Sequence, residues 1–248
     1  MALDLSNVEA LCFDVDGTLR DTDDQFVERL VRMLKPVRFL FPKQDPHPFA
    51  RKLVMMIETP GNFLFGIPDR LGIDDEIAAV GDYMYRRGSG KSHKPFVMVP
   101  GVKEALLVLK PHFKMSVVSA RGGPSTKGFL DQFELGSFFE CVATARTCER
   151  TKPHPDPILW AAEQMDVTAE KCLMIGDTIV DILAAKAAGA QSVGVLCGFG
   201  EQEELQNAGA DLILMSTDLL PKHLLNSQCL GIGQLKPTPP LDESPQSV

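Results

Sequence analysis

The sequence of 248 residues lacks the features that two large classes of protein require. It has no excess of basic residues, because 25 lysines and arginines stand against 33 aspartates and glutamates, for a formal net charge of −8. Nucleic-acid binding needs a basic face that neutralises phosphates, so this charge argues against a nucleic-acid partner. No apolar run approaches the roughly 18 residues that a membrane helix needs, so we also expect no membrane partner.

Signals for export are scarce as well. The first ten residues, MALDLSNVEA, carry acids and no basic flank before an apolar segment, so we expect no signal peptide. The six cysteines form no C-x-x-C pair, and several lie in strand-like runs. Reduced structural thiols are typical of proteins of the cytoplasm, which is the location that we predict.

Short apolar runs recur along the chain and alternate with helical patterns. The runs that we interpret as strands are residues 8–13, 114–119, 140–144, 171–176, 192–196 and 211–215. The clearest helical patterns are residues 101–110, 156–165 and 180–190. Asp156 is the expected N-cap of the second helix, with Pro157 at its first position, and Gly189 is the expected C-cap of the third. The alternation predicts an α/β fold with a parallel sheet.

About 100 residues between the first two strands break this rhythm. Residues 20–97 are richer in aromatics, prolines and helix-like spacing, and they contain no convincing strand. We interpret them as a helical insertion rather than as further sheet, so that the core comprises residues 1–19 and 98–225. The tail, residues 226–248, has the proline, glycine and serine content of a disordered segment.

Two carboxylates follow the first predicted strand, where a parallel sheet places its ligands. Asp14 and Asp16 are spaced by one residue, which in a strand puts both on the same side. Like charges held that close cost free energy unless a cation or a shared proton relieves them. Gly17 allows a tight turn after them, and Asp21 or Thr22 is a candidate cap for a following helix.

Other polar side chains follow the later strands. Ser119 ends the second strand, Lys152 sits on a loop stiffened by prolines, and Asp177 and Asp181 follow the strand at 171–176 with a helical spacing of four. Each alone is ordinary turn, surface or cap chemistry. Together they bring four carboxylates and one lysine to one end of the sheet, and a hard divalent cation such as Mg²⁺ resolves that repulsion.

Four motifs in this order, DVDGT (14–18), VVS (117–119), TKPHP (151–155) and GDTIVD (176–181), resemble those of the haloacid dehalogenase-like superfamily. The span from about Val8 to Leu214 is similar to the phosphoglycolate phosphatase-like branch. The resemblance implies a Rossmann-like core with helices on both faces and a small helical cap at 20–97, inserted after the first strand. It further implies a Mg²⁺-dependent phosphatase acting on a small phosphorylated metabolite.

The resemblance assigns roles to the motif residues. Asp14 attacks phosphorus and forms an aspartyl-phosphate, and Asp16 protonates the leaving oxygen and then activates water. Mg²⁺ is held by Asp14, by the backbone carbonyl of Asp16 and by Asp177, with Asp181 supporting its outer shell. The implied substrate-binding residues are Thr18, Ser119, Ala120 and Lys152, and Lys152 is also counted as catalytic.

Several alternatives stay open at this stage. The second motif often has asparagine after serine, whereas Ala120 and Arg121 follow here, so Arg121 is either a solvated loop residue or an anion contact. The cap residues Arg86, Arg87, Lys91, His93 and Lys94 form either a solvated basic face or a substrate contact.

The choice of reaction also has alternatives. Asp16 argues against a dehalogenase, because dehalogenases of this fold do not need an acid at that position to protonate an oxygen leaving group. A phosphomutase, a pyrophosphatase and a non-catalytic binding protein remain alternatives, and we expect a monomer or a homodimer.

The resemblance does not name the substrate. Phosphoglycolate, pyrophosphate, a sugar phosphate and a nucleoside monophosphate all fit a site that contacts only the phosphoryl group and the metal. Discrimination among them then falls to residues outside that shell.

Overall fold

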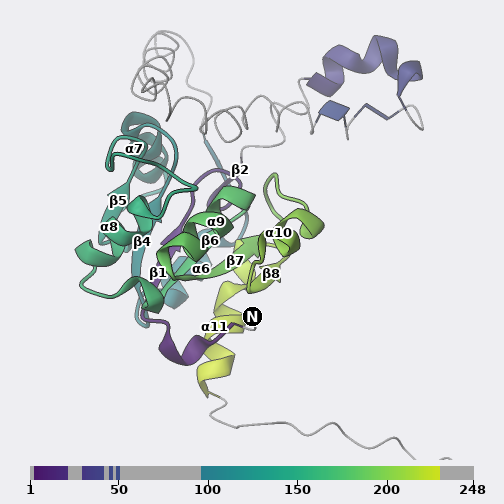
Figure 1. Cartoon of the computed structure of the whole chain (residues 1–248). Helices are drawn as coiled ribbons and strands as arrows, with labels where there is room; N and C mark the ends of the chain where they lie inside the picture. The colour runs from purple at the N-terminus through teal and green to yellow at the C-terminus, as the bar shows by residue number, and fades with distance from the viewer. Residues whose placement is uncertain (1–2, 22–29, 42–44, 47–48, 51–95, 230–248) are drawn as a thin grey trace, which may run out of the picture.

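A computed structural model of the chain describes residues 3–21, 30–41, 45–46, 49–50 and 96–229. At its centre lies a six-stranded sheet with the strand order β5-β4-β1-β6-β7-β8, which Figure 1 shows from left to right. The strands are β1 (Ala10–Phe13), β4 (Lys114–Val118), β5 (Cys141–Ala143), β6 (Cys172–Gly176), β7 (Gln191–Val195) and β8 (Leu212–Leu214). All neighbouring strands are parallel. The six predicted strands and the parallel sheet are therefore confirmed.

Strand β1 is the central strand of the sheet. Its residues are all buried, and it pairs with β4 through Phe13↔Val117 and with β6 through Phe13↔Ile175. A strand with sheet neighbours on both sides and helices on both faces has no solvated face, so it forms a continuous apolar run instead of an alternating one.

Helices cover both faces of this sheet. They are α6 (Val102–Leu109), α7 (Gly123–Gln132), α8 (Asp156–Gln164), α9 (Ile179–Ala188), α10 (Gln202–Ala208) and α11 (Leu220–Cys229). Leu11 and Phe13 of β1 share one apolar cluster with residues of α6, α7 and α11, whereas Ala10 and Cys12 share another with residues of α8 and α9. Because successive strand residues point to opposite faces, these two clusters are the two layers of the core, and the predicted Rossmann-like class is confirmed.

Short 3-10 helices are also present. They are η1 (Leu5–Asn7), η2 (Lys35–Leu40), η4 (Gly136–Phe138), η5 (Ala169–Lys171) and η6 (Thr217–Leu219). All but η2, which lies in the predicted cap, belong to the core. None of the helices in the described part of the chain is both long and apolar enough to cross a membrane.

Two expected helix ends differ from the structure, and one agrees. Asp156 is the first residue of α8 instead of its N-cap, which is Pro155, because proline at the second helical position already fixes the entry of the chain. Asp21, one of the two candidate caps after the first motif, is a strand residue that pairs with Val97, and the other candidate, Thr22, lies outside the described residues. Gly189 does close α9, with a left-handed φ of 76° that a glycine adopts without strain.

The two ends of the predicted insertion lie side by side. Strand β2 (Arg20–Asp21) pairs antiparallel with β3 (Val97–Met98) through Arg20↔Met98. The chain therefore leaves the core and returns to it at one place, although these short strands were not predicted. Residues 51–95, including the basic cluster at 86–94, lie outside the described residues. At the other end of the chain, α11 continues to Cys229, and residues 230–248 also lie outside them.

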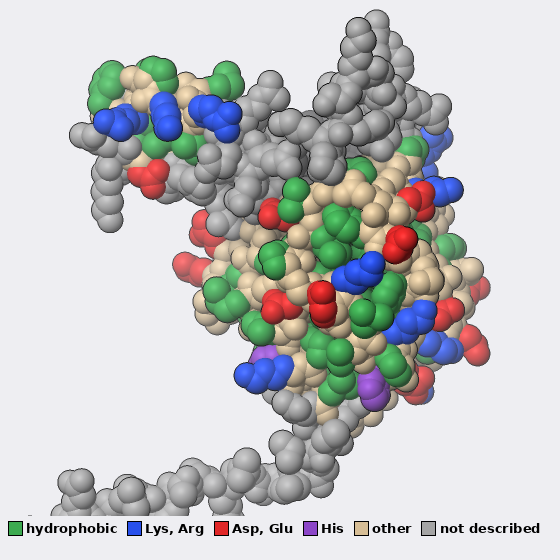
Figure 2. All heavy atoms as spheres, turned by 180° about the vertical axis from the view of Figure 1, so that it is seen from behind, with side chains coloured by type: hydrophobic (Ala, Val, Ile, Leu, Met, Phe, Trp, Pro, Cys, Tyr) green, Lys and Arg blue, Asp and Glu red, His purple; other side chains and the backbone are tan. Residues whose placement is uncertain are grey.

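Charges of both signs are spread over the face of the core seen in Figure 2. The described segment 30–41 differs, because its exposed side chains include Arg32, Lys35 and Arg38. Figure 2 shows basic side chains together on one side of this segment, which belongs to the predicted cap.

Candidate active site

The candidate site lies where the order of the strands reverses. Numbered along the chain, the sheet runs third, second, first, fourth, fifth and sixth strand, so the reversal falls between β1 and β6. Open α/β sheets bind ligands outside the carboxyl ends of their strands at such a point. Asp14 follows β1 directly, and Asp177 follows β6.

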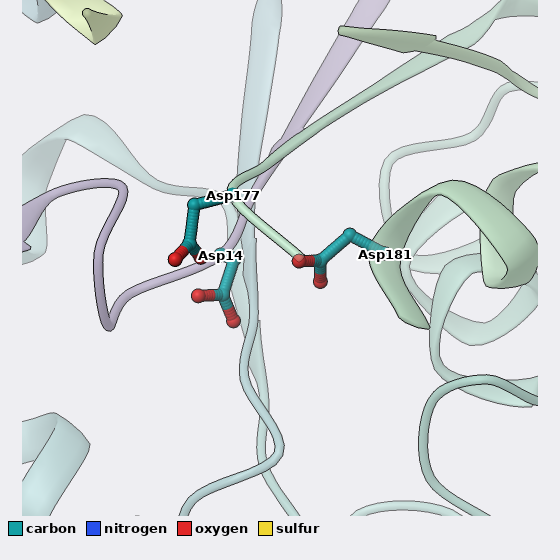
Figure 3. Close-up of side chains that lie close together, drawn as sticks. All are labelled: Asp14, Asp177 and Asp181. Carbon is teal, nitrogen blue, oxygen red and sulfur yellow. The ribbon is translucent and has the colours of Figure 1, made fainter. Parts of the chain in front are cut away.

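Three carboxylates converge at this point. Asp14, Asp177 and Asp181 each offer an oxygen, and these oxygens lie within 4.8 Å of one another. Figure 3 shows Asp14 and Asp177 at adjacent strand ends, with the Asp181 side chain approaching from α9. The three residues are 7%, 0% and 1% exposed. Three buried carboxylates this close repel one another strongly, and their hard oxygen donors fit a divalent cation such as Mg²⁺.

Lys152 supplies the positive charge that the structure places inside this cluster. Its ammonium is 2.5 Å from Oδ1 of Asp14 and 2.6 Å from Oδ1 of Asp181, and the residue is 2% exposed. Burial lowers the pKa of Lys152, but the two carboxylates more than offset this, so the pKa lies above its usual range. Lys152 is thus a fixed cation, and its pairing with Asp181 was not predicted.

The carboxyl group of Asp14 has a perturbed acidity. Burial, together with the charges of Asp181 and Asp16, raises its pKa to about 7 against the opposing attraction of Lys152. A raised pKa means that the ionised form lacks compensating positive charge. A divalent cation at the cluster supplies that charge and favours the carboxylate, which is the nucleophilic form.

Asp181 is held by the start of its own helix. Its Oδ2 accepts hydrogen bonds from the backbone N–H of Thr178, at 3.1 Å, and from the Thr178 hydroxyl, at 2.7 Å. These bonds form part of a capping box, so Oδ2 accepts hydrogen bonds at the start of α9, whereas Oδ1 pairs with the ammonium of Lys152. The role of Asp181 in the outer shell of the metal, which the resemblance implies, stays a prediction.

Asp16 stands outside the carboxylate cluster and pairs with arginines. Arg121 forms an ion pair with Oδ2 of Asp16 through Nε, and Arg20 lies 3.4 Å from Oδ1. The Asp16 side chain is 16% exposed, whereas Asp14 is buried. The role of Asp16 in proton transfer stays a prediction, and its predicted metal contact involves only its backbone carbonyl.

The predicted substrate-binding residues are in different settings. Ser119 is buried, and its Oγ accepts a hydrogen bond from the backbone N–H of Arg121 at 3.1 Å. Ala120 is half-buried. Thr18 is fully buried, and its carbonyl accepts a hydrogen bond from the Thr217 hydroxyl at 2.7 Å. Substrate contact by these three residues stays a prediction.

A further contact to the site comes from a loop that lies outside the four motifs. The loop between β7 and α10 reaches Asp177, because the backbone N–H of Phe199 donates to its Oδ2 at 2.7 Å. The sequence carries one signal of this contact. Two glycines, Gly198 and Gly200, lie in the loop that follows an apolar strand, a pattern that indicates close approach of the backbone to another group.

Comparison with known proteins agrees with the motifs. A family model described as haloacid dehalogenase-like hydrolase matches residues 11–195. The chain is 31% identical over 218 residues to pyrophosphatase PpaX of Anoxybacillus flavithermus, an alignment that covers 86% of this chain and 96% of the relative. It is 28% identical over 207 residues to phosphoglycolate phosphatase of Pseudomonas putida, covering 82% of this chain and 74% of the relative.

A solved structure of similar fold extends this agreement. A hydrolase from Pseudomonas syringae superposes with a TM-score of 0.60 at 25% identity and covers 88% of this chain and 98% of its own. The recognised branch and the prediction of an enzyme are confirmed by these matches. The family model matches well over half of the chain, and the chain therefore belongs to the haloacid dehalogenase-like hydrolase family.

Proposed function

We propose that the protein is a Mg²⁺-dependent phosphatase that hydrolyses a small phosphorylated metabolite through an aspartyl-phosphate on Asp14. The observation that carries the proposal is the buried cluster of Asp14, Asp177 and Asp181, in which the ammonium of Lys152 pairs with Asp14 and Asp181. The family match and the two relatives named as phosphatases support the reaction class.

Asp14 is the proposed nucleophile. One oxygen of its carboxylate forms a bond to phosphorus while the bond from phosphorus to the leaving oxygen breaks. Asp16 gives its proton to that oxygen. The phosphoryl group is then bonded to Asp14, so one difficult displacement becomes two easier ones.

The second step reverses the proton transfer. Asp16, now a carboxylate, takes a proton from water as the water oxygen attacks phosphorus, and the bond between phosphorus and the Asp14 oxygen breaks. Inorganic phosphate leaves, and both side chains return to their starting states. The half-buried position of Asp16, two residues after the buried Asp14, supports this division of roles.

Mg²⁺ held by Asp14, Asp177 and the Asp16 carbonyl would supply positive charge for the phosphoryl oxygens. Lys152 holds Asp14 in place and adds a second fixed charge beside the reacting oxygen. Asp181 orients Lys152 from the opposite side. Ser119 and the backbone that follows it stand at the neighbouring strand end, which supports a phosphoryl contact there.

Phosphoglycolate and pyrophosphate are the substrates to test first, because the two relatives carry these names. The helical cap at 20–97 and the core at 1–19 and 98–225 remain part of the proposal. The adjacent β2 and β3 support a single point of insertion. A cytoplasmic location is supported by the free thiols of Cys12, Cys141, Cys148, Cys172 and Cys197.

The test is release of inorganic phosphate by the full-length protein from a panel of phosphoglycolate, pyrophosphate, a sugar phosphate and a nucleoside monophosphate. Each substrate is assayed after metal removal and again with Mg²⁺. We expect release only with the metal, and none from the Asp14→Asn variant. An isomeric phosphate ester in place of inorganic phosphate would show a mutase instead. No conversion of any substrate, with any divalent cation, would favour a binding protein.

A further inference from the structure

One loop contacts both turns that carry the proposed metal site. It connects β7 to α10 and comprises residues 196–201. The backbone N–H of Phe199 donates to Oδ2 of Asp177 at 2.7 Å, and the thiol of Cys197 donates to the carbonyl oxygen of Gly17 at 3.3 Å. Gly17 belongs to the turn that follows Asp14 and Asp16. The loop therefore links the first and the last of the four motifs.

The contact between loop and site leaves no room for a side chain at Gly198. A Cβ placed there would overlap Oδ2 of Asp177 and lie 2.6 Å from the carbonyl oxygen of Gly17. A Cβ on Gly17 itself would also overlap the Asp177 carboxylate, and its φ of 78° favours glycine independently. The carboxylate of Asp177 is thus enclosed between two glycine backbones, which restricts its rotation.

A second support comes from the next strand of the sheet. Thr217, at the start of η6 after β8, is 1% exposed, and its hydroxyl donates to the carbonyl of Thr18 at 2.7 Å. The same hydroxyl lies 3.7 Å from the Cys197 sulfur. The turn at 17–18 is therefore held through two consecutive carbonyls, one bound by Cys197 and the other by Thr217.

We propose that residues 197–199, together with Thr217, are the positioning element of the metal site. They contact neither the reacting atoms nor, in the proposed mechanism, the substrate. They fix the orientation of the Asp177 carboxylate and the path of the backbone at 16–18, so that the ligand oxygens are in place before the metal binds. Outer contacts of this kind raise metal affinity by removing the cost of ordering the ligands. The inference rests on the proposed metal-dependent function.

The decisive variant is Gly198→Ala, in which the added methyl group displaces the Asp177 carboxylate. The measurement is calorimetric titration of the metal-free, full-length protein with Mg²⁺ and, separately, with Mn²⁺. We expect the dissociation constant to rise by about 10- to 100-fold, the usual range for loss of a contact that orients a metal ligand. Thermal unfolding in EDTA, where no metal contributes, reports the stability of the same variant.

Gly194→Ala is the matched control. Gly194 lies in β7, before the same loop, and a Cβ there would meet Leu205 at 2.9 Å instead of Asp177. We expect this variant to unfold at a lower temperature in EDTA while its folded form binds Mg²⁺ as the wild type does. Gly136→Ala, which would place a Cβ with no atom within 4 Å, controls for the exchange of glycine for alanine alone.

Thr217 provides a second test if Gly198→Ala does not fold. Thr217→Val keeps the shape and removes the hydroxyl donor, whereas Thr217→Ser keeps the donor. We expect weaker Mg²⁺ binding in the valine variant and recovery in the serine variant, because the bond to the Thr18 carbonyl is the part that positions the turn. A purely structural role would lower the unfolding temperature of the valine variant without changing its affinity for Mg²⁺.

The outcomes separate this inference from the proposed function. If the wild type binds no divalent cation, the proposed metal-dependent function is itself wrong. If the wild type binds Mg²⁺ and releases phosphate, but the folded Gly198→Ala and Thr217→Val variants bind the metal equally well, the positioning role is wrong. Equal loss of affinity in Gly194→Ala would likewise contradict it, because the effect would then be general destabilisation.

Discussion

Arg121 forms an ion pair with the carboxylate of Asp16, although the two residues follow different strands of the sheet. Arg121 itself is held at its backbone: its N–H donates to Oγ of Ser119 at 3.1 Å, and its carbonyl accepts from the N–H of Ala145 at 2.9 Å. These bonds fix the backbone from which the guanidinium reaches Asp16. The guanidinium orients the side chain that we propose as the general acid and base.

Replacing Arg121 with methionine tests this role. With only the longer contact to Arg20 left, Asp16 adopts more orientations, so the fraction poised to protonate the leaving oxygen falls. We expect kcat to fall by about tenfold or more for alkyl phosphates, which need that proton, since small misplacements of catalytic groups carry such costs. An aryl phosphate, with a good leaving group, should lose less.

Arg150→Met is the matched control for Arg121→Met. Arg150 also pairs with a carboxylate, at 3.0 Å from Asp156, and its side chain is 48% exposed. We expect it to leave both activities unchanged. Arg121 would be a surface residue without a positioning role if its variant behaved like the control.

Asp16→Asn addresses the acid directly. The amide keeps the shape and the backbone carbonyl, so Mg²⁺ affinity should change little, but it cannot donate and accept the proton as required. We expect the rate with alkyl phosphates to drop by about 10²-fold or more, the usual contribution of a general acid or base. Equal losses with alkyl and aryl phosphates would show that Asp16 is not the acid.

Lys152→Met tests the charge balance of the cluster. Removing the ammonium leaves the carboxylates of Asp14 and Asp181 buried without their shared cation. Breaking a buried ion pair in this way costs about 3–5 kcal/mol of unfolding free energy. Urea unfolding in EDTA measures this loss, and addition of Mg²⁺ should restore part of it, because the metal stabilises the same carboxylates.

The control for Lys152→Met is Lys171→Met. Lys171 pairs with Glu9 at 2.6 Å, but the two side chains are 38% and 53% exposed. Exposed pairs contribute at most about 1 kcal/mol, so this variant should remain near wild-type stability. A similar effect in both variants would mean that the buried cluster does not depend on Lys152.

The sequence predicted the fold and the placement of the principal carboxylates well, because both follow from strand periodicity. A strand such as residues 10–13 is apolar throughout because helices cover both faces of the sheet, and the ends of parallel strands share one edge of the sheet. The proximity of Asp14 and Asp177 could therefore be predicted from the sequence alone.

Contacts between loops could not be derived in the same way. The pairing of Lys152 with Asp181 depends on the path of residues 144–155, and that of Arg121 with Asp16 on two loops that no periodicity fixes. The contact of Phe199 with Asp177 is made by a backbone N–H, which every residue but proline possesses, so its side chain gives no signal. Only the neighbouring glycines mark the place.

Asp14→Asn establishes whether the carboxylate is needed for turnover. The amide is nearly the same shape, so the fold should be preserved, and its circular dichroism spectrum should match that of the wild type. The amide cannot form the acyl-phosphate, so phosphate release should vanish for alkyl and aryl phosphates alike. Turnover close to that of the wild type would remove Asp14 as the nucleophile.

The most direct test of the account is detection of the phosphorylated enzyme itself. Wild-type protein is mixed with Mg²⁺ and substrate, quenched in acid during the first turnover and digested for mass spectrometry. We predict one added phosphoryl group on the peptide that contains Asp14, formed before product accumulates, dependent on the metal and absent from Asp14→Asn. Release of product with no phosphorylated peptide, or with the phosphoryl group on another residue, would contradict the aspartyl-phosphate mechanism.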